Sequence, residues 1–98
     1  MIADLTYDSF APHIGSGFAI SSDGYDDVLT LVSIDRGPQG PATGRQPFSL
    51  NLRGGRTDVM YNSMMFVLTH PEMGAFELFI NPTGKNADGT VSYEVPFN

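Results

Sequence analysis

Carboxylates and imidazoles are the side chains of this chain whose spacing bears on metal chemistry. Asp23, Asp26 and Asp27 lie within five residues, and their oxygens are ligands of the kind that Ca²⁺ prefers. Their spacing does not fit the D-x-D-x-D-G loop, because glycine follows Asp23 immediately. His13 and His70 are the only histidines, so a three-ligand zinc site would need a carboxylate as well. We therefore expect no metal and no cofactor, with the aspartates in a solvated turn and His70 ending a strand.

The nucleophilic and the basic side chains do not form a catalytic motif either. The chain has no cysteine, and none of its serines lies in a G-x-S-x-G frame. Arg53 and Arg56 flank Gly54 and Gly55, where two guanidinium groups and a backbone nest could hold an anion. The alternative is a wide hairpin turn with solvated arginines. Acid, base and nucleophile do not come together as a motif, so we predict that the protein is not an enzyme.

The composition indicates one folded domain over residues 1–98. Hydrophobic residues make up 41% of the chain and charged residues only 16%, which argues against disorder. A chain of this length buries a single modest core. Its net charge is −6, with only five basic residues, so it lacks the positive surface that nucleic acids and anionic membranes require. We expect neither of these partners.

The first residues of the chain and its apolar stretches bear on where in the cell the protein is expected. It has no basic region followed by an apolar run, and no stretch approaches the roughly 20 apolar residues of a membrane span. We expect cytoplasmic synthesis without a signal peptide. Incorporation into a virion or an extracellular tail-like assembly would be a route outside the cell.

Turn residues divide the chain into short elements. Thr6 as an N-cap and Asp8 in the first turn predict a short helix that ends by Pro12, with Leu5 and Phe10 facing the core. Alternating or continuous apolar runs predict strands at residues 17–21, 28–35, 48–53, 64–68, 76–80 and 90–97. The predicted fold is all-β: a small antiparallel β-barrel or sandwich of about six strands, with the short N-terminal helix over one opening.

The hairpin over residues 64–82 is the strongest local signal. Gly74 suits a left-handed residue that closes a turn, because it has no Cβ to clash. A three-residue loop at 72–74 would place His70 opposite Phe76 and Leu68 opposite Leu78. A four-residue loop starting at Pro71 would divide the apolar residues between both faces, so we prefer the first register. It buries one face of the hairpin, formed by Phe66, Leu68, Phe76, Leu78 and Ile80, and leaves Val67, Thr69, Glu77 and Phe79 on the other.

A family resemblance spans the whole chain. It is carried by Leu5-Thr6 with Phe10, Gly15 with Phe18, the strand 29–32, the PFSL stretch 47–50, Leu68 with His70-Pro71-Glu72 and Gly74, residues 77–80 with Pro82, Tyr93-Glu94, and Phe97-Asn98. In these positions the chain resembles a family of small uncharacterised bacterial proteins of about the same length. Many members are encoded beside tail-collar-type fibre proteins of phage-tail-like systems, so the resemblance implies a role in such an assembly. The family has no established catalytic residues to carry over.

The apolar pattern leaves side chains that one core does not absorb. Strand 28–35 and hairpin 64–82 are apolar on both faces, and no element follows strand 90–97 to cover its edge. We expect a contact surface formed by Met64, Met65, Val67, Phe79, Tyr93 and Phe97. The function predicted is that of a non-enzymatic structural or interaction protein of a phage-tail-like, fibre-like or virion assembly. It would work as a homo-oligomer or bound to a tail- or fibre-type protein. The alternative is a small-molecule or carbohydrate-binding module.

Overall fold

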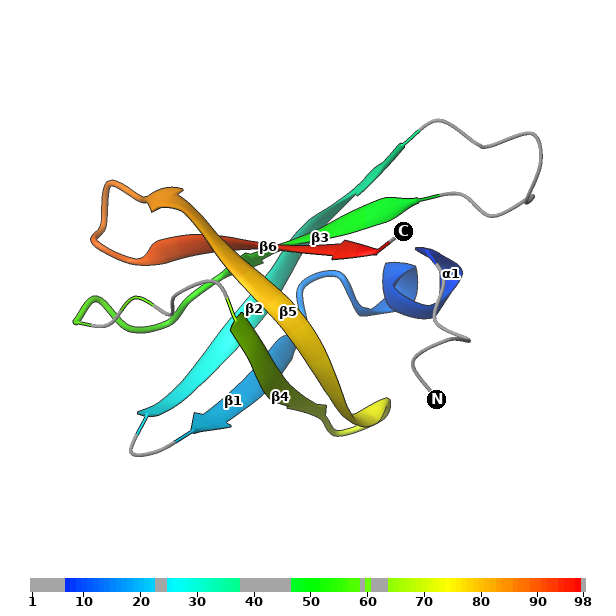
Figure 1. Ribbon diagram of the computed structural model, residues 1–98, viewed down its shortest axis with the longest axis horizontal. Helices are drawn as coiled ribbons and strands as arrows, with labels where there is room; N and C mark the ends of the chain where they lie inside the picture. Colours follow the sequence, from blue (N-terminus) through cyan, green and yellow to red (C-terminus); the bar gives the residue numbers. More distant parts are fainter. Residues whose placement is uncertain (1–6, 23–24, 38–46, 59, 61–63, 98) are drawn as a thin grey trace.

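Alternating apolar residues build the wall of a barrel. The computed structural model describes residues 7–22, 25–37, 47–58, 60 and 64–97. In these residues, antiparallel strands close in the order β1-β2-β3-β6-β5-β4 (Figure 1). The strands are β1 (Gly17–Ser22), β2 (Tyr25–Arg36), β3 (Phe48–Arg53), β4 (Met64–His70), β5 (Gly74–Lys85) and β6 (Val91–Phe97). The all-β prediction is confirmed, and the closed barrel, not the sandwich, is the architecture.

β3 and β6 show most clearly how the sequence pattern becomes a core. Leu50 opposes Val95 and Leu52 opposes Tyr93, and all four side chains are buried. The residues between them face outward, as the two-residue period of a strand requires. Equivalent inward-facing residues of the other strands complete the core, namely Phe18, Ile20, Leu29, Leu31, Phe66, Leu68, Leu78 and Ile80.

A short helical segment closes one end of the barrel, as predicted. It consists of α1 (Tyr7–Phe10) and the 3₁₀ turn η2 (Ala11–His13), and Figure 1 shows α1 at one end of the barrel. So short a helix is unstable alone. Phe10 holds it in place, since this side chain is fully buried and lies 5.4 to 6.2 Å, between ring centroids, from four other phenylalanines. Leu5 and the predicted N-cap Thr6 lie outside the described residues.

Two strands are longer than the sequence pattern predicted. β2 and β5 each extend over 12 residues, and each contains an irregularity, between Leu31 and Ser33 in β2 and between Pro82 and Gly84 in β5. Proline cannot donate to a ladder, so its usual place inside a sheet is an edge or a bulge. The irregularity beside Pro82 therefore lets β5 continue to Lys85, where the sequence alone suggested an end.

The predicted register of the β4–β5 hairpin is wrong by two residues. The observed pairs are His70 with Gly74, Leu68 with Phe76, and Phe66 with Leu78, so the loop is residues 71–73. His70 is the physical reason. Its Nδ1 accepts the backbone N–H groups of Glu72 and Met73 at 3.0 and 3.2 Å, which closes the turn directly after this residue.

The faces of the hairpin nevertheless follow the prediction. A shift of two residues preserves the direction of every side chain, whereas a shift of one would reverse it. Phe66, Leu68, Leu78 and Ile80 are buried, and Phe76 packs partly buried against the core. Gly74 has a φ of 89°, so its predicted left-handed conformation is confirmed.

Candidate functional site

An apolar surface lies on the outside of four adjacent strands, and we call it the outer apolar face. Val28, Met65, Val67 and Phe79 are 51, 47, 48 and 42% exposed. Met65 opposes Phe79 across the β4–β5 pair, and Val67 follows Met65 on the same side of β4. Ala19 of β1, which is also exposed, opposes Val28 of β2. The face therefore runs from β5 through β4 and β1 to β2.

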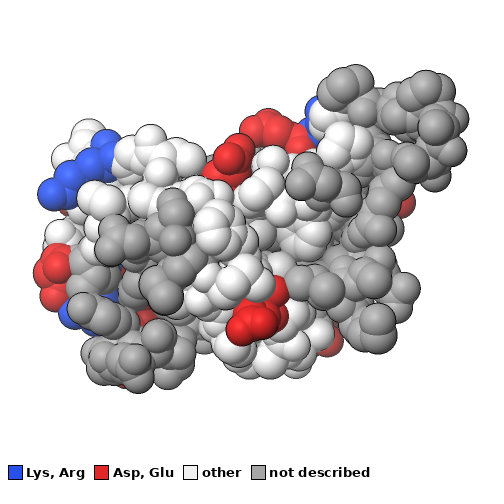
Figure 2. Space-filling model, viewed as in Figure 1, with Lys and Arg blue, Asp and Glu red and all other residues white. Residues whose placement is uncertain are grey.

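The register makes this face continuous. β1 and β4 pair through Ala19 with Thr69, so Val67 and Ala19 are diagonal neighbours on the outer side. Over β4 and β5, the described surface in Figure 2 is mostly uncharged, with acidic groups at isolated positions. One of the acidic residues of this region is Glu77, which opposes Val67 and is exposed. The outer apolar face is thus a largely uncharged surface with an acidic neighbour.

The predicted contact residues do not all belong to this face. Met65, Val67 and Phe79 do, and the side chain of Met64 lies outside the described part of the structure. Tyr93 is only 1% exposed, because its ring fills the core opposite Leu52, so it is wrong as a contact residue. Phe97 is half-buried and stacks on Phe48 at 4.6 Å between ring centroids, so part of its ring packs against the core, and its place in a contact stays a prediction.

The predicted free edge of β6 is also wrong. β6 has no open edge, since it pairs with β3 on one side and β5 on the other. Among the described residues, the shortest pairing in the barrel is that of β1 with β4, at Ala19 with Thr69 and Ile20 with Leu68. In Figure 1 these two strands cross and then diverge toward the end of β1. Sequence periodicity could not reveal this pairing, because it depends on how distant strands meet.

The barrel end opposite the helix is polar and internally bonded. Asp88 accepts hydrogen bonds from the hydroxyl and the N–H of Thr90, at 2.6 and 3.0 Å, and forms an ion pair with Arg53. These hydrogen bonds from Thr90, together with the nearby guanidinium, lower the pKa of Asp88 to about 2. Arg56 binds Asp58 with two hydrogen bonds, which lower the pKa of that carboxyl as well.

These bonds use the groups that an anion would need. Arg53 and Arg56 each face a carboxylate, and the backbone N–H of Gly54 donates to the carbonyl of Val91. The N–H of Gly55 donates to the carboxylate of Asp27 at 3.0 Å. The turn therefore fits the alternative of a hairpin connection, although its arginines are paired rather than merely solvated.

The aspartate cluster serves the same end of the barrel. Asp27 also accepts the N–H of Val28 at 2.8 Å, so its carboxylate links β2 to the loop at Gly55. Asp26 is exposed on the outer side of β2, opposite Ser21, and Asp23 lies outside the described residues. The two described aspartates thus point to different sides of the strand, as adjacent residues must.

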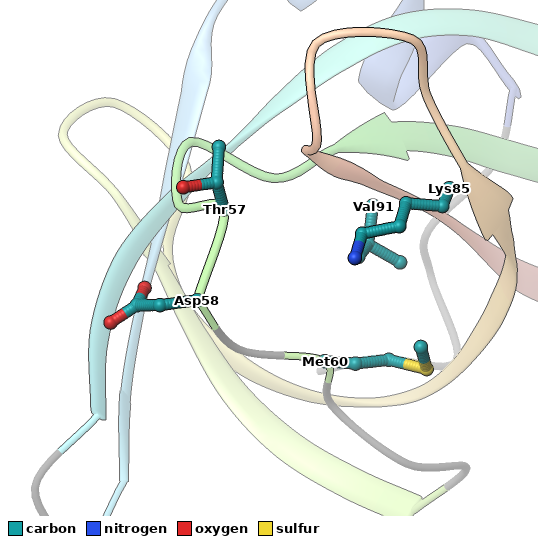
Figure 3. Close-up of a pocket in the computed structure, with 5 residues that line it drawn as sticks. All are labelled: Thr57, Asp58, Met60, Lys85 and Val91. Carbon is teal, nitrogen blue, oxygen red and sulfur yellow. The ribbon is translucent and has the colours of Figure 1, made fainter.

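A shallow pocket lies beside this network. Its volume is about 190 Å³, and it is lined by Thr57, Asp58, Met60, Lys85 and Val91. Figure 3 shows that the Lys85 side chain reaches into it from β5, whereas the carboxylate of Asp58 points away. Ligand pockets are typically about 300–1,000 Å³. The space is therefore small, and its main polar group is one exposed ammonium.

A second cluster lies at the helical end. His13 Nδ1 is 3.7 Å from a carboxylate oxygen of Glu72, and the candidate ligand atoms of His13, His70 and Glu72 lie within 4.8 Å of one another. The residue types are those of a zinc site. However, Nδ1 of His70 already accepts two N–H groups, so the ring proton must be on Nε2. Neither nitrogen of His70 offers a free lone pair unless the turn opens.

Sequence comparison adds a family to this description. A family model described as "Domain of unknown function (DUF6916)" matches residues 5–97. The chain belongs to this family. No curated protein and no solved structure matches it. Within the described residues, no helix has the length and apolar character needed to cross a membrane.

Proposed function

We propose that the protein is a non-enzymatic interaction module that docks on a protein partner through the outer apolar face. The observation that carries this proposal is the exposure of Val28, Met65, Val67 and Phe79, each between 42 and 51%, on one continuous surface. Sheets of small domains normally keep one face wet and polar. Exposed apolar surface of this kind is typical of protein contacts.

The wider setting that we propose is a phage-tail-like, fibre-like or virion assembly. This part rests on the resemblance to small proteins encoded beside tail-collar-type fibre proteins. The partner would then be a tail- or fibre-type protein or a second copy of this chain. A module kept for its shape would use its side chains for packing and turn formation, which is how the structure uses His70, Asp27 and Asp88.

Site-specific crosslinking tests the proposal. A photoreactive residue at position 67 should capture a tail- or fibre-type protein in the native host, identified by mass spectrometry. The matched control is the same residue at position 32, because Val32 is 52% exposed on β2, roughly 13 Å further along the strand than Val28. Equal capture at both positions, or capture at neither, would contradict docking through this face.

Light scattering coupled to size exclusion tests the form with a second copy as partner. A homo-oligomer should dissociate on dilution, and Phe79→Ser should shift it toward monomer, because this substitution removes an exposed ring from the face. A monomer over a wide concentration range, with Phe79→Ser no more soluble than the parent, would leave docking on another protein as the function.

A small-molecule or carbohydrate-binding module is the second candidate. The observation in its favour is the pocket at Lys85 and Met60. Its small volume would limit a ligand to an anionic group or a fragment of a sugar. Chemical shifts near Lys85 that saturate with a simple monosaccharide or carboxylate, and that Lys85→Met abolishes, would favour this candidate over the interaction module.

A further inference from the structure

We propose that the outer apolar face receives a partner protein whose own apolar surface carries a basic side chain, arginine or lysine, that pairs with Glu77. The occupant is then a different protein and not another copy of this chain. This inference rests on the proposed function, because it specifies the chemistry of the partner that docks on the same face.

Glu77 lies directly against the outer apolar face. It opposes Val67 across the β4–β5 pair, and Phe79 follows it two residues later on the same side of β5. Met65, which opposes Phe79, and Ala75, two residues before Glu77, complete its surroundings on this side. All of these side chains are exposed. A partner that covers Val67 and Phe79 therefore covers the carboxylate next to them as well.

Within the described residues, no lysine or arginine forms an ion pair with Glu77. Neither β1 nor β4 contains a lysine or arginine, and the basic residue of β5 is Lys85 at its far end. Lys85 is eight residues from Glu77, about 26 Å along an extended strand. The Debye length at physiological ionic strength is only about 8 Å, so this ammonium does little for the carboxylate. In Figure 2 the described surface over the middle of β4 and β5 shows no basic group.

Docking would remove water from the carboxylate of Glu77. A charged group that loses its water without gaining an opposite charge is strongly unfavourable. A wholly apolar partner surface would leave Glu77 in that condition. A guanidinium or ammonium group would pair with the carboxylate, while apolar side chains around it cover Val67 and Phe79. The partner must therefore supply a cation within an apolar surface.

A second copy does not supply this cation. In a two-fold contact, each subunit presents the same surface to the other. A contact centred on Val67 and Phe79 would bring a second Glu77, whereas Lys85 and Arg36 lie at the ends of β5 and β2. The net charge of −6 adds repulsion between copies. Glu77 thus disfavours self-association through this face and selects a basic partner.

Two peptides that differ in charge alone provide the probe. One is a short peptide of leucine and serine with a single central arginine. The other carries citrulline in place of arginine, which has nearly the same shape but no charge. We expect the arginine peptide to shift the amide resonances of residues 65–67 and 77–79, and to bind at least roughly fivefold more tightly than the citrulline peptide.

Two protein variants assign this preference to one carboxylate. Glu77→Gln should abolish the preference for arginine and leave the binding of the citrulline peptide unchanged, because only the charge is removed. Glu94→Gln is the matched control, since Glu94 lies on β6 opposite Asn51, on another part of the barrel, and it should keep the preference. Equal losses in the two variants would mean that net charge alone attracts the peptide, and the assignment to Glu77 would be wrong.

Light scattering coupled to size exclusion tests the exclusion of a second copy. The parent protein should stay monomeric, whereas Glu77→Leu should self-associate, because it removes the charge from the apolar surface. Glu94→Leu is the control and should stay monomeric. A parent that dimerises, and that Phe79→Ser converts to monomer, would make a second copy the occupant. A Glu77→Leu variant that stays monomeric would show that Glu77 does not exclude it. Either result overturns this part of the inference.

The remaining outcomes separate this inference from the proposed function. Equal binding of both peptides, or no binding up to about 10 mM, would overturn the need for a cation. Resonance shifts confined to residues other than 65–67 and 77–79 would overturn the site. Crosslinking at position 67 that captures a tail- or fibre-type protein through a contact without lysine or arginine would leave the proposed function intact and reject this inference alone.

Discussion

Two parts of the barrel wall differ in the polarity of their outward-facing side chains. Where β3 pairs with the last residues of β2, outward side chains bond to one another: Asn51 donates to Ser33 and Asp35 at 3.0 and 2.9 Å. On β4 and β5 the corresponding outward positions hold Met65 and Phe79, which oppose one another and remain about half exposed. Both sides bury equivalent inward rows, so the core does not explain the difference. On the polar side, the outward side chains already bond to one another within the monomer. On the apolar side, the outward side chains remain exposed to water, and a partner would cover them.

The turn that holds the apolar side together should give the largest effect. Gly74→Val should destabilise the protein by about 1–3 kcal/mol, because a β-branched residue resists the positive φ of this position. Gly84→Val is the matched control, since Gly84 lies in β5 with open space around its Cα and has no positive φ. Thermal unfolding measures both. Equal losses would mean that the conformation of Gly74 does not limit the hairpin.

His70 tests the same hairpin through a hydrogen bond. His70→Phe keeps a buried ring but removes the acceptor for the N–H groups of Glu72 and Met73, so we expect a loss of about 1–2 kcal/mol. His13→Phe is the control, because its ring contacts His70 but no turn amide is known to depend on it. Denaturant unfolding should show the larger loss for His70→Phe. The reverse order would argue against His70 as the residue that fixes the register.

A pair of surface substitutions tests the comparison itself. Asn51→Ala should cost about 0.5–1.5 kcal/mol, because it breaks the bonds to Ser33 and Asp35. Val67→Thr should change the stability of the monomer by less than about 0.5 kcal/mol, because its side chain is already half exposed. If Val67→Thr proves the more costly of the two, the apolar side is packed in the monomer and is not free for docking.

Sequence pattern predicted local structure better than it predicted where distant strands meet. The alternation in Phe48–Arg53 and Val91–Phe97 identified both strands and their buried faces, because a two-residue period reports directly on side-chain direction. The pairing of β6 with both β3 and β5 is not encoded in that period, so the predicted free edge was wrong. The hairpin register was wrong because a side chain, His70, rather than turn propensity closes the loop.

Some residues of the candidate site could be predicted from the sequence, and others could be found only from the pairing of distant strands. The exposure of Met65, Val67 and Phe79 was predictable, since these residues lie opposite the buried row of a hairpin that is apolar on both faces. Ala19 and Val28 joined them only once the β1–β4 and β1–β2 registers were known. Glu72 could not be placed beside the two histidines, because His13 and His70 lie far apart in the sequence and meet only through the helical plug.

The polar end of the barrel gives a smaller, pH-dependent effect. The pKa of Asp88 is about 2 in the folded protein, against 3.8 for a free carboxyl, because Thr90 and Arg53 stabilise its charged form. A lowered pKa contributes stability that is present above the unfolded value and is lost as pH falls from about 4 through about 2. Asp88→Asn should therefore flatten the stability curve in this range. A variant curve that keeps the slope of the parent between about pH 4 and pH 2 would contradict this origin.

Metal addition should have the smallest effect, namely none. Zn²⁺ would need lone pairs from both His13 and His70, but two backbone N–H groups occupy Nδ1 of His70 and leave Nε2 as a donor. Binding would therefore have to open the turn at residues 71–73, whose bonds fix the register of the apolar side. We expect no shift in the thermal midpoint with Zn²⁺ or Ca²⁺. A saturable stabilisation by Zn²⁺ that EDTA reverses, and that both His13→Phe and Glu72→Gln abolish, would instead show that this end of the barrel is built for a metal. The turn would then have to rearrange when the metal binds.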